Sequence, residues 1–323
     1  MSRAVIIGGS GHVGTYLVPR LVEAGFEVVN VSRGQSKPYH SNGAWKAVRH
    51  VSLDRDAEEK AGTFGRKIRE LEGDVVIDMI CFTPESARQL VEALEGNVQH
   101  FLHCGTVWVH GVSTVVPTTE LSPRRPFGEY GINKEAIERY LLDRARRHGF
   151  PATLVHPGHI VGPGWPCINP AGNVNVEVFS KIARGEELLL PNFGLETVHH
   201  VHADDVAQMF MRAIANRANA IGEAFHTVSP AALTLRGFAE AMYRWFGHEP
   251  NIRCLPWPEW QKTQDKTDAE VTWEHVARSP NCSIAKAARM IGYAPRYTSL
   301  EAVEEAVEWL IGAGRVDAGG RAA

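Results

Sequence analysis

The chain has 323 residues, of which 44% are hydrophobic and 22% are charged. This composition predicts a folded protein of roughly two domains and argues against disorder. The formal net charge of -3 argues against a broad nucleic-acid-binding surface, although a local basic patch stays open.

The sequence also limits where the protein works. No window holds about 18 uninterrupted apolar residues, so we expect no membrane span. The N-terminal apolar run breaks at Gly8, too early for a signal peptide. The 5 cysteines are scattered without a CxxC pair, which argues against a disulfide framework or a four-cysteine zinc site and fits a reducing cytosol. We therefore expect a cytoplasmic protein.

The first half alternates strand and helix patterns. Helical spacing follows the first strand up to Gly25, and a second helix is predicted over 129–148 with Gly149 as its stop. The predicted strands cover 4–7, 26–31, 48–53, 75–77, 101–102 and 152–155. Repeated strand–helix units predict an α/β fold, a Rossmann-type doubly wound parallel sheet with a smaller mixed C-terminal substrate region.

The regular strand–helix pattern ends after about residue 160, where Pro and Gly cluster. A Trp- and Pro-rich stretch over 255–260 either roofs a substrate pocket or packs a surface loop, and a last amphipathic helix is predicted over 300–311. The expected organisation is a dinucleotide-binding domain over 1–165 to which 188–230 returns, a substrate-binding region over 166–187 and 231–312, and a flexible tail over 313–323.

A glycine-rich loop follows the first predicted strand and opens the first helix. Gly8, Gly11 and Gly14 have GxxGxxG spacing, which allows a tight turn, a close backbone approach to a pyrophosphate and close packing of helix on strand. The helix N-terminus then offers free N–H groups to phosphates. We assign the three glycines, with His12 and Val13, to the cofactor site.

The end of the second strand bears on the choice of dinucleotide. An acidic residue there would bind a ribose 2′-hydroxyl, but this chain has Ser32 and Arg33, which suit a 2′-phosphate. We therefore favour NADP over NAD, with the alternative that Arg33 stacks on adenine or faces solvent. Asp54 is a candidate for the adenine amino group or an ordinary loop residue.

Tyr130 and Lys134 are spaced four residues apart, which places them on one helical face. Ile137 and Leu141 continue that face, so Lys134 lies on an apolar stripe, where a lysine needs a partner such as a ribose and a phenol. The ammonium, like a positive nicotinamide ring, would lower the pKa of Tyr130, which then exchanges a proton with substrate while hydride moves to or from the cofactor. A snorkelling surface lysine is the alternative.

Thr106 follows the fifth predicted strand. The carboxyl ends of strands in such sheets face the ligand crevice. We expect its hydroxyl to orient the reacting oxygen; otherwise it caps a turn.

With these residues in view, the chain resembles an extended short-chain dehydrogenase/reductase of the NAD-dependent epimerase/dehydratase family. Residues 156–164 (HPGHIVGPG) and 201–207 (VHADDVA) are similar to two further segments of that family, so the resemblance covers nearly the whole length. It implies Thr106, Tyr130 and Lys134 as catalytic residues, hydride chemistry at a hydroxyl of a sugar or nucleotide-sugar, and a homodimer. We assign Pro157 and His159 to the cofactor site, and Trp108 and Asn173 to the substrate site.

The chain departs from the family pattern in three places. Val107 and Trp108 replace the Asp-Glu pair of the dehydratase branch, so dehydration is doubtful, and His110 replaces a usual tyrosine. His156 stands where an arginine is usual. These changes bear on the substrate more than on the fold.

Two functional hypotheses follow. The first is an NAD(P)-dependent epimerase or reductase, and the sequence does not separate these because both need the same three residues. The alternative is a non-catalytic dinucleotide-sensing or RNA-associated member of the same fold, against which the retained Tyr130–Lys134 pair and the acidic balance argue. We expect no nucleic-acid or membrane partner, and no metal, since the histidines of 199–202 lack a second ligand cluster with known spacing.

Overall fold

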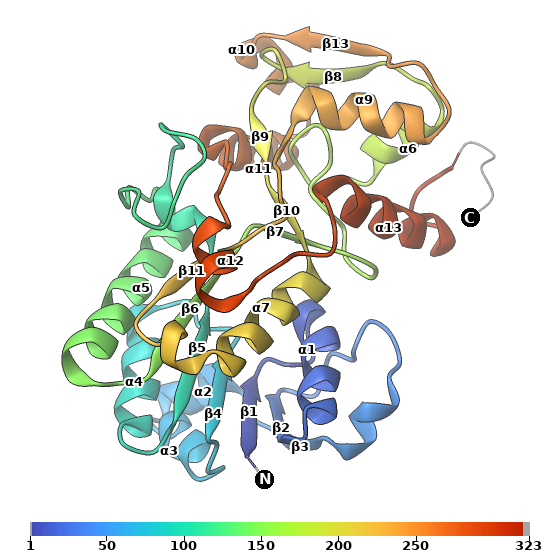
Figure 1. Cartoon of the computed structure of the whole chain (residues 1–323). Coiled ribbons are helices and arrows are strands. Elements are labelled where there is room, and N and C mark those ends of the chain that lie inside the picture. Colours follow the sequence, from blue (N-terminus) through green and yellow to red (C-terminus); the bar gives the residue numbers. More distant parts are fainter. Residues whose placement is uncertain (1, 319–323) are drawn as a thin grey trace.

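A seven-stranded parallel sheet forms the centre of the molecule (Figure 1). The computed structural model describes residues 2–318. From one edge to the other, the strands are β11 (Ala224–Thr227), β6 (Ala152–Pro157), β5 (His100–Cys104), β4 (Val75–Asp78), β1 (Arg3–Ile7), β2 (Glu27–Ser32) and β3 (Arg49–Ser52). The strand order reverses between β1 and β4, which is where doubly wound sheets bind their ligands. The predicted Rossmann-type sheet is confirmed.

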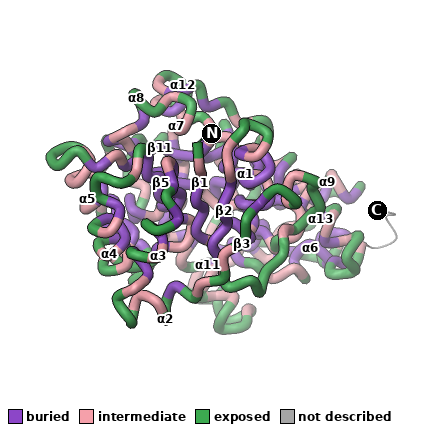
Figure 2. Tube along the Cα trace, turned by 90° about the horizontal axis from the view of Figure 1, so that it is seen from below, coloured by how far each residue is buried: buried purple, intermediate pink, exposed green. Residues whose placement is uncertain are grey.

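Helices cover both faces of this sheet because its strands are apolar on both sides. Along β1, Ala4 and Ile6 join one core, and Val5 and Ile7 join the other. The first core lies under α1 (His12–Glu23), α7 (Ala203–Ala215) and α12 (Ala285–Ile291), and the second under α3 (Phe64–Arg69), α4 (Pro84–Leu94) and α5 (Glu129–His148). The sheet and these helices form the lower lobe of the molecule. Figure 2 shows the buried strands at the centre of this lobe. Its short helices are α2 (Arg55–Lys60), α8 (Arg217–Ala220), η1 (Gly43–Ala47) and η2 (Val107–His110).

The helix that carries Tyr130 has the predicted bounds. It starts after Gly128, whose φ is 72°, and ends at Gly149, which takes the left-handed conformation with φ 73°. A left-handed residue strongly favours glycine, so this end is fixed by the sequence itself.

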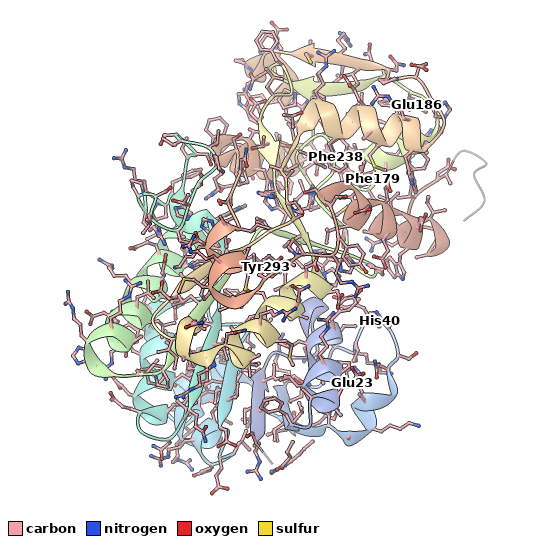
Figure 3. The ribbon with its side chains drawn as sticks, in the orientation of Figure 1. Glu23, His40, Phe179, Glu186, Phe238 and Tyr293 are labelled. Atoms are coloured by element: carbon pink, nitrogen blue, oxygen red, sulfur yellow. The ribbon has the colours of Figure 1, made fainter. Side chains whose placement is uncertain are left out.

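A third core builds an upper lobe above the carboxyl ends of the strands. Phe179 and Phe238 meet there with ring centroids 6.4 Å apart (Figure 3). The helices of this lobe are α6 (Glu177–Ala183), α9 (Leu235–Trp245), α10 (Trp257–Trp260), η3 (Gln261–Thr263), α11 (Lys266–Arg278) and α13 (Ser299–Gly312). Its paired strands are β8 (Leu188–Pro191) with β13 (Ile252–Leu255), and β9 (Thr197–Val198) with β12 (Leu233–Thr234); β7 (His159–Val161) and β10 (His200–His202) pair at the junction of the lobes.

The chain passes between the lobes at different points from those expected. Residues 188–198 belong to the upper lobe, because β8 and β9 pair with β13 and β12, and the return to the sheet begins at β10. Tyr293, expected in the substrate region, is 1% exposed in the lower core and donates its hydroxyl to the Val228 carbonyl at 3.2 Å (Figure 3). The tail expected to be flexible from 313 packs at Val316, which is 4% exposed in the upper core; residues 319–323 lie outside the described part.

Candidate active site

A cleft of about 470 Å³ opens where β1, β4, β5 and β6 end, between the two lobes. Every assigned residue of the glycine loop lines it, as do the three assigned catalytic residues. The complete lining is Gly8, Gly11, His12, Val13, Gly14, Met79, Ile80, Phe82, Cys104, Gly105, Thr106, Trp108, Tyr130, Lys134, Pro157, Gly158, His159, Ile160, Trp165, Pro166, Ile168 and Val174.

The glycine loop has the geometry that a pyrophosphate needs. Gly8 has φ 86°, and a Cβ on Gly14 would lie 1.9 Å from the carbonyl oxygen of Gly9, so α1 packs against the loop only with glycine at position 14. At Gly11, which caps α1, the nearest atom to an added Cβ is 3.7 Å away. The loop is therefore tight against the protein and open at Gly11 toward the cleft, where the N-terminus of α1 could receive an anion.

His12 is buried under an aromatic pair that the sequence did not reveal. Trp165 stacks on its ring at 5.5 Å, and Tyr39 meets it edge-on at 5.3 Å. Burial lowers the pKa of His12 to about 4, helped by His202, so its ring is neutral at pH 7. Neither ring nitrogen has a hydrogen-bond partner within the protein.

Beside the glycine loop, a separate hollow of about 340 Å³ takes in Ser10, Ser32, Arg33 and Asp54. Buried Asn30 donates to the Ser10 hydroxyl at 2.8 Å, and Ser10 in turn lies 3.4 Å from the Ser32 hydroxyl. Arg33 is exposed at the rim. The hollow thus holds hydroxyl donors and a guanidinium, whereas Asp54 caps α2 by accepting from the Ala57 N–H at 3.1 Å.

Lys134 is 2% exposed, and its partners are backbone carbonyls. Its ammonium donates to the carbonyl oxygens of Cys81 and Cys104, each at 2.8 Å. Lysine has three donors, so one remains for a ligand. Burial lowers its pKa, and the position on the apolar face of α5 is confirmed.

Tyr130 lies one turn before Lys134, with the ammonium 5.7 Å from its ring centroid. We expected a lowered pKa, but desolvation raises the pKa of Tyr130 to about 12, and a hydrogen bond with the Thr106 side chain opposes this rise. For the ligand-free protein the expectation is therefore wrong, because desolvation outweighs the opposing hydrogen bond.

Rings from both lobes meet at Trp108, which lines the end of the cleft where we expect the substrate and is supported from behind by residues of the upper lobe. The Trp108 ring meets Tyr130 at 5.8 Å and His275 of α11 at 5.4 Å. The Arg278 guanidinium is sandwiched between the rings of Trp108 and Phe127, 3.8 Å from each centroid. His275 and Arg278 were missed because residues so far along the chain carry no motif that links them to Trp108.

Two expected substrate contacts do not reach the cleft. Asn173 is fully buried, and its amide donates to the Thr272 hydroxyl at 3.2 Å, so it holds the loop before α6 against α11. Trp260 is fully buried and its indole N–H donates to the Leu189 carbonyl at 2.9 Å, and the Trp257 ring contacts Trp273 in a tilted arrangement with centroids 5.4 Å apart. The Trp-rich stretch therefore packs the upper lobe and borders an outer hollow of about 910 Å³.

The buried histidines 199, 200 and 202 each have their own protein partner. One other trio within residues 2–318 brings three ligand types together: Asp78, Cys81 and His103 have donor atoms within 4.8 Å of one another. The Arg55 guanidinium already binds Asp78 at 2.7 Å, and the Lys134 ammonium lies close by. Two fixed cations oppose a metal ion there, and we propose none.

The fold and the cleft define a dinucleotide-binding α/β protein with a separate substrate lobe. The model of the NAD dependent epimerase/dehydratase family matches residues 4–226. The chain therefore belongs to that family, and the predicted class, an NAD(P)-dependent epimerase or reductase of the short-chain dehydrogenase/reductase superfamily, is confirmed.

Three relatives illustrate the range of this family. The chain is 28% identical to a 2′-dehydrokanamycin reductase of Streptomyces kanamyceticus, over 97% of this chain and 86% of that protein. It is 24% identical to a chloroplast stem-loop binding protein of 41 kDa from Arabidopsis thaliana, over 97% and 80%. The UDP-glucose 4-epimerase of Thermotoga maritima has the same fold, with a TM-score of 0.72 and 21% identity, over 96% of this chain and 99% of that one.

Across residues 2–318, none of the helices combines the length and apolar character that a bilayer crossing requires.

Proposed function

We propose that the protein transfers hydride between a nicotinamide dinucleotide and a hydroxyl or keto carbon of a sugar, with Tyr130 as acid/base, Lys134 beside it and Thr106 orienting the reacting oxygen. The supporting observation is that these three residues, from two different elements, line one cleft together with the glycine loop. The open space at Gly11 and the free third donor of Lys134 fit a bound dinucleotide.

The protein's part in the reaction follows from these positions. A nicotinamide held at this site would accept or supply the hydride, and the residues of the chain handle the proton and the orientation of the substrate. Tyr130, protonated at neutral pH because its pKa is raised, donates to a keto oxygen in the reducing direction. In the oxidising direction it must first lose that proton, which a positive nicotinamide ring favours. The rings of Trp108 and Phe82 flank the phenol, with centroids 5.8 and 6.5 Å from its own.

Among sugars, the cleft favours one that carries no diphosphate. Among residues 2–318, Lys134 is the one lysine or arginine in its lining, and its ammonium donates to two carbonyls. His12 and His159 have lowered pKa values through burial, so they bring no positive charge. A substrate diphosphate would meet aromatic and apolar groups instead of cations. Titration with UDP checks this, because submillimolar binding at the substrate end would contradict it.

For the cofactor we propose NADP. The support is the hollow at the end of β2, which offers two serine hydroxyls and Arg33 without an acid at the ribose position.

The deciding experiment offers the protein NADP⁺ or NAD⁺ with a panel of free sugars, methyl glycosides, and UDP- and dTDP-sugars. Reduced cofactor is followed by absorbance and epimers by NMR. We expect turnover, and we expect Tyr130→Phe to lower kcat by about 100-fold or more, the usual scale of acid–base catalysis. Tyr140→Phe, a half-buried tyrosine of the same helix, is the matched control. Near-normal turnover by Tyr130→Phe overturns the assignment.

The similarity to the stem-loop binding relative supports a second candidate function, a non-catalytic protein that associates with RNA. Retention of an RNA stem-loop by the protein in a gel shift, with no turnover anywhere in the panel, would favour the non-catalytic alternative.

A further inference from the structure

His156 lies directly behind Thr106, where the sequence departs from its family. It is the fifth residue of β6 and is completely buried. The backbone N–H of Thr106 donates to its Nδ1 at 2.9 Å. Thr106 is therefore held by a side chain of the neighbouring strand at the point where β5 has ended.

This contact fixes the protonation state of the ring. Since Thr106 donates, Nδ1 must carry a lone pair, and in the neutral ring the proton then sits on Nε2. That nitrogen faces the carboxylate of buried Glu138 at 3.5 Å. The Arg124 guanidinium binds this carboxylate, so the carboxylate is ionised and favours a proton on Nε2.

The carboxylate is itself anchored. Arg124 binds both oxygens of Glu138, at 2.5 and 3.2 Å, and also donates to the carbonyls of Glu120 and Ser122, each at 2.7 Å. The order of contacts is thus guanidinium, carboxylate, imidazole and amide: hydrogen bonds join the first two groups and the last two, and Glu138 lies at ion-pair distance, 3.5 Å, from the imidazole. Such a chain can specify a single ring orientation at Thr106.

Packing at Gly105 restricts the ring further. A Cβ at this position would lie 2.2 Å from Nδ1 of His156 and 2.5 Å from its Cε1. The imidazole therefore rests against the bare Cα of Gly105, one residue before the amide that it binds. A glycine here permits the close approach that the hydrogen bond requires.

We propose that His156 is a positioning residue for Thr106: its neutral imidazole, oriented by Glu138 and Arg124, holds the Thr106 amide and so sets the hydroxyl at the cleft. The catalytic half of this statement rests on the proposed function. The structural half stands without it, because it concerns only which acceptor holds one amide.

Two substitutions of His156 separate the position of the hydrogen-bond acceptor from the size of the side chain. In His156→Asn, the amide oxygen falls near the place of Nδ1 and can still accept from Thr106. In His156→Gln, the longer side chain carries its amide toward the place of Nε2, and the acceptor is lost. His100→Asn and His100→Gln are matched controls, because His100 is equally buried on β5 with one partner, the Thr153 hydroxyl at 2.8 Å.

Amide hydrogen exchange in the full-length protein reads the contact directly, and the neighbouring amide is its internal reference. The Gly105 N–H binds the backbone carbonyl of Val155 at 2.7 Å and does not depend on the histidine. We expect His156→Gln to speed exchange at Thr106 about 10-fold or more relative to Gly105, and His156→Asn to stay within about 3-fold of wild type. The His100 variants should leave the ratio unchanged.

With a panel substrate, kcat should follow the same order, falling about 10-fold or more in His156→Gln with KM nearly constant. Equal losses in His156→Asn and His156→Gln, or an unchanged Thr106 exchange ratio in both, overturn the positioning role. If instead the exchange result holds but Tyr130→Phe keeps full turnover, the proposed function fails and the amide contact stands.

Discussion

Replacing Arg33 by alanine tests the choice of cofactor. Its guanidinium stands at the rim of the hollow that holds Ser10 and Ser32, where an adenosine 2′-phosphate would accept from all three. A hydrogen bond to a charged group contributes about 1.5–3 kcal/mol, and Arg33 is exposed, so solvent screening reduces this by roughly half. The remaining contribution of about 0.75–1.5 kcal/mol means that Arg33→Ala should weaken NADPH binding about 3- to 13-fold and leave NADH binding within about 2-fold.

The assay is fluorescence titration of NADPH and NADH at low and high salt. The NADPH advantage of the wild type should shrink with salt, since the contact is an exposed charge pair. Lys37→Ala is the matched control, because Lys37 is an exposed cation of the same loop that lines only the adjacent hollow. Equal weakening of NADPH and NADH, or an unchanged NADPH affinity in Arg33→Ala, would refute the 2′-phosphate argument.

Three further outcomes are expected. Lys134→Met leaves two buried carbonyls without their donor, which should lower the free energy of unfolding by about 2–4 kcal/mol after relief of ammonium desolvation. Scanning calorimetry should therefore show a Tm lower by roughly 5–12 °C. A Tm within about 2 °C of wild type would contradict these contacts. Gly14→Ala drives a Cβ to within 1.9 Å of the Gly9 carbonyl and should weaken NADPH binding while costing about 1–3 kcal/mol of stability, whereas unchanged values of both would contradict the close packing. In ultraviolet difference titration against Tyr130→Phe, the ligand-free phenol should titrate near its pKa of about 12, and NADP⁺ should lower that pKa. Because the folded-state pKa of Tyr130 lies above its unfolded value, the stability of the protein should fall as pH rises from about 10 to about 12. A titration midpoint near 10 would contradict the desolvation of the phenol.

Within the site, the sequence reached residues whose chemistry depends on local spacing. The glycines of the loop stand at fixed intervals beside one strand, and Tyr130 and Lys134 stand one turn apart on one helix. Each set is therefore brought together by a short stretch of chain in any fold that forms those elements. Asp54 and Asn173 lacked such a constraint, and the structure engages them in a helix cap and a buried amide contact.

The sequence by itself determined the parallel sheet, the tight loop before α1 and the helix that ends at Gly149, because hydrophobic periodicity and glycine conformations act over a few residues. Only the tertiary structure decided the walls of the cleft. His275 and Arg278 reach Trp108 across more than 160 residues of chain, and His156 reaches Thr106 from a neighbouring strand. Such contacts depend on how sheet and upper lobe pack, and long-range packing leaves no periodic signal in the chain.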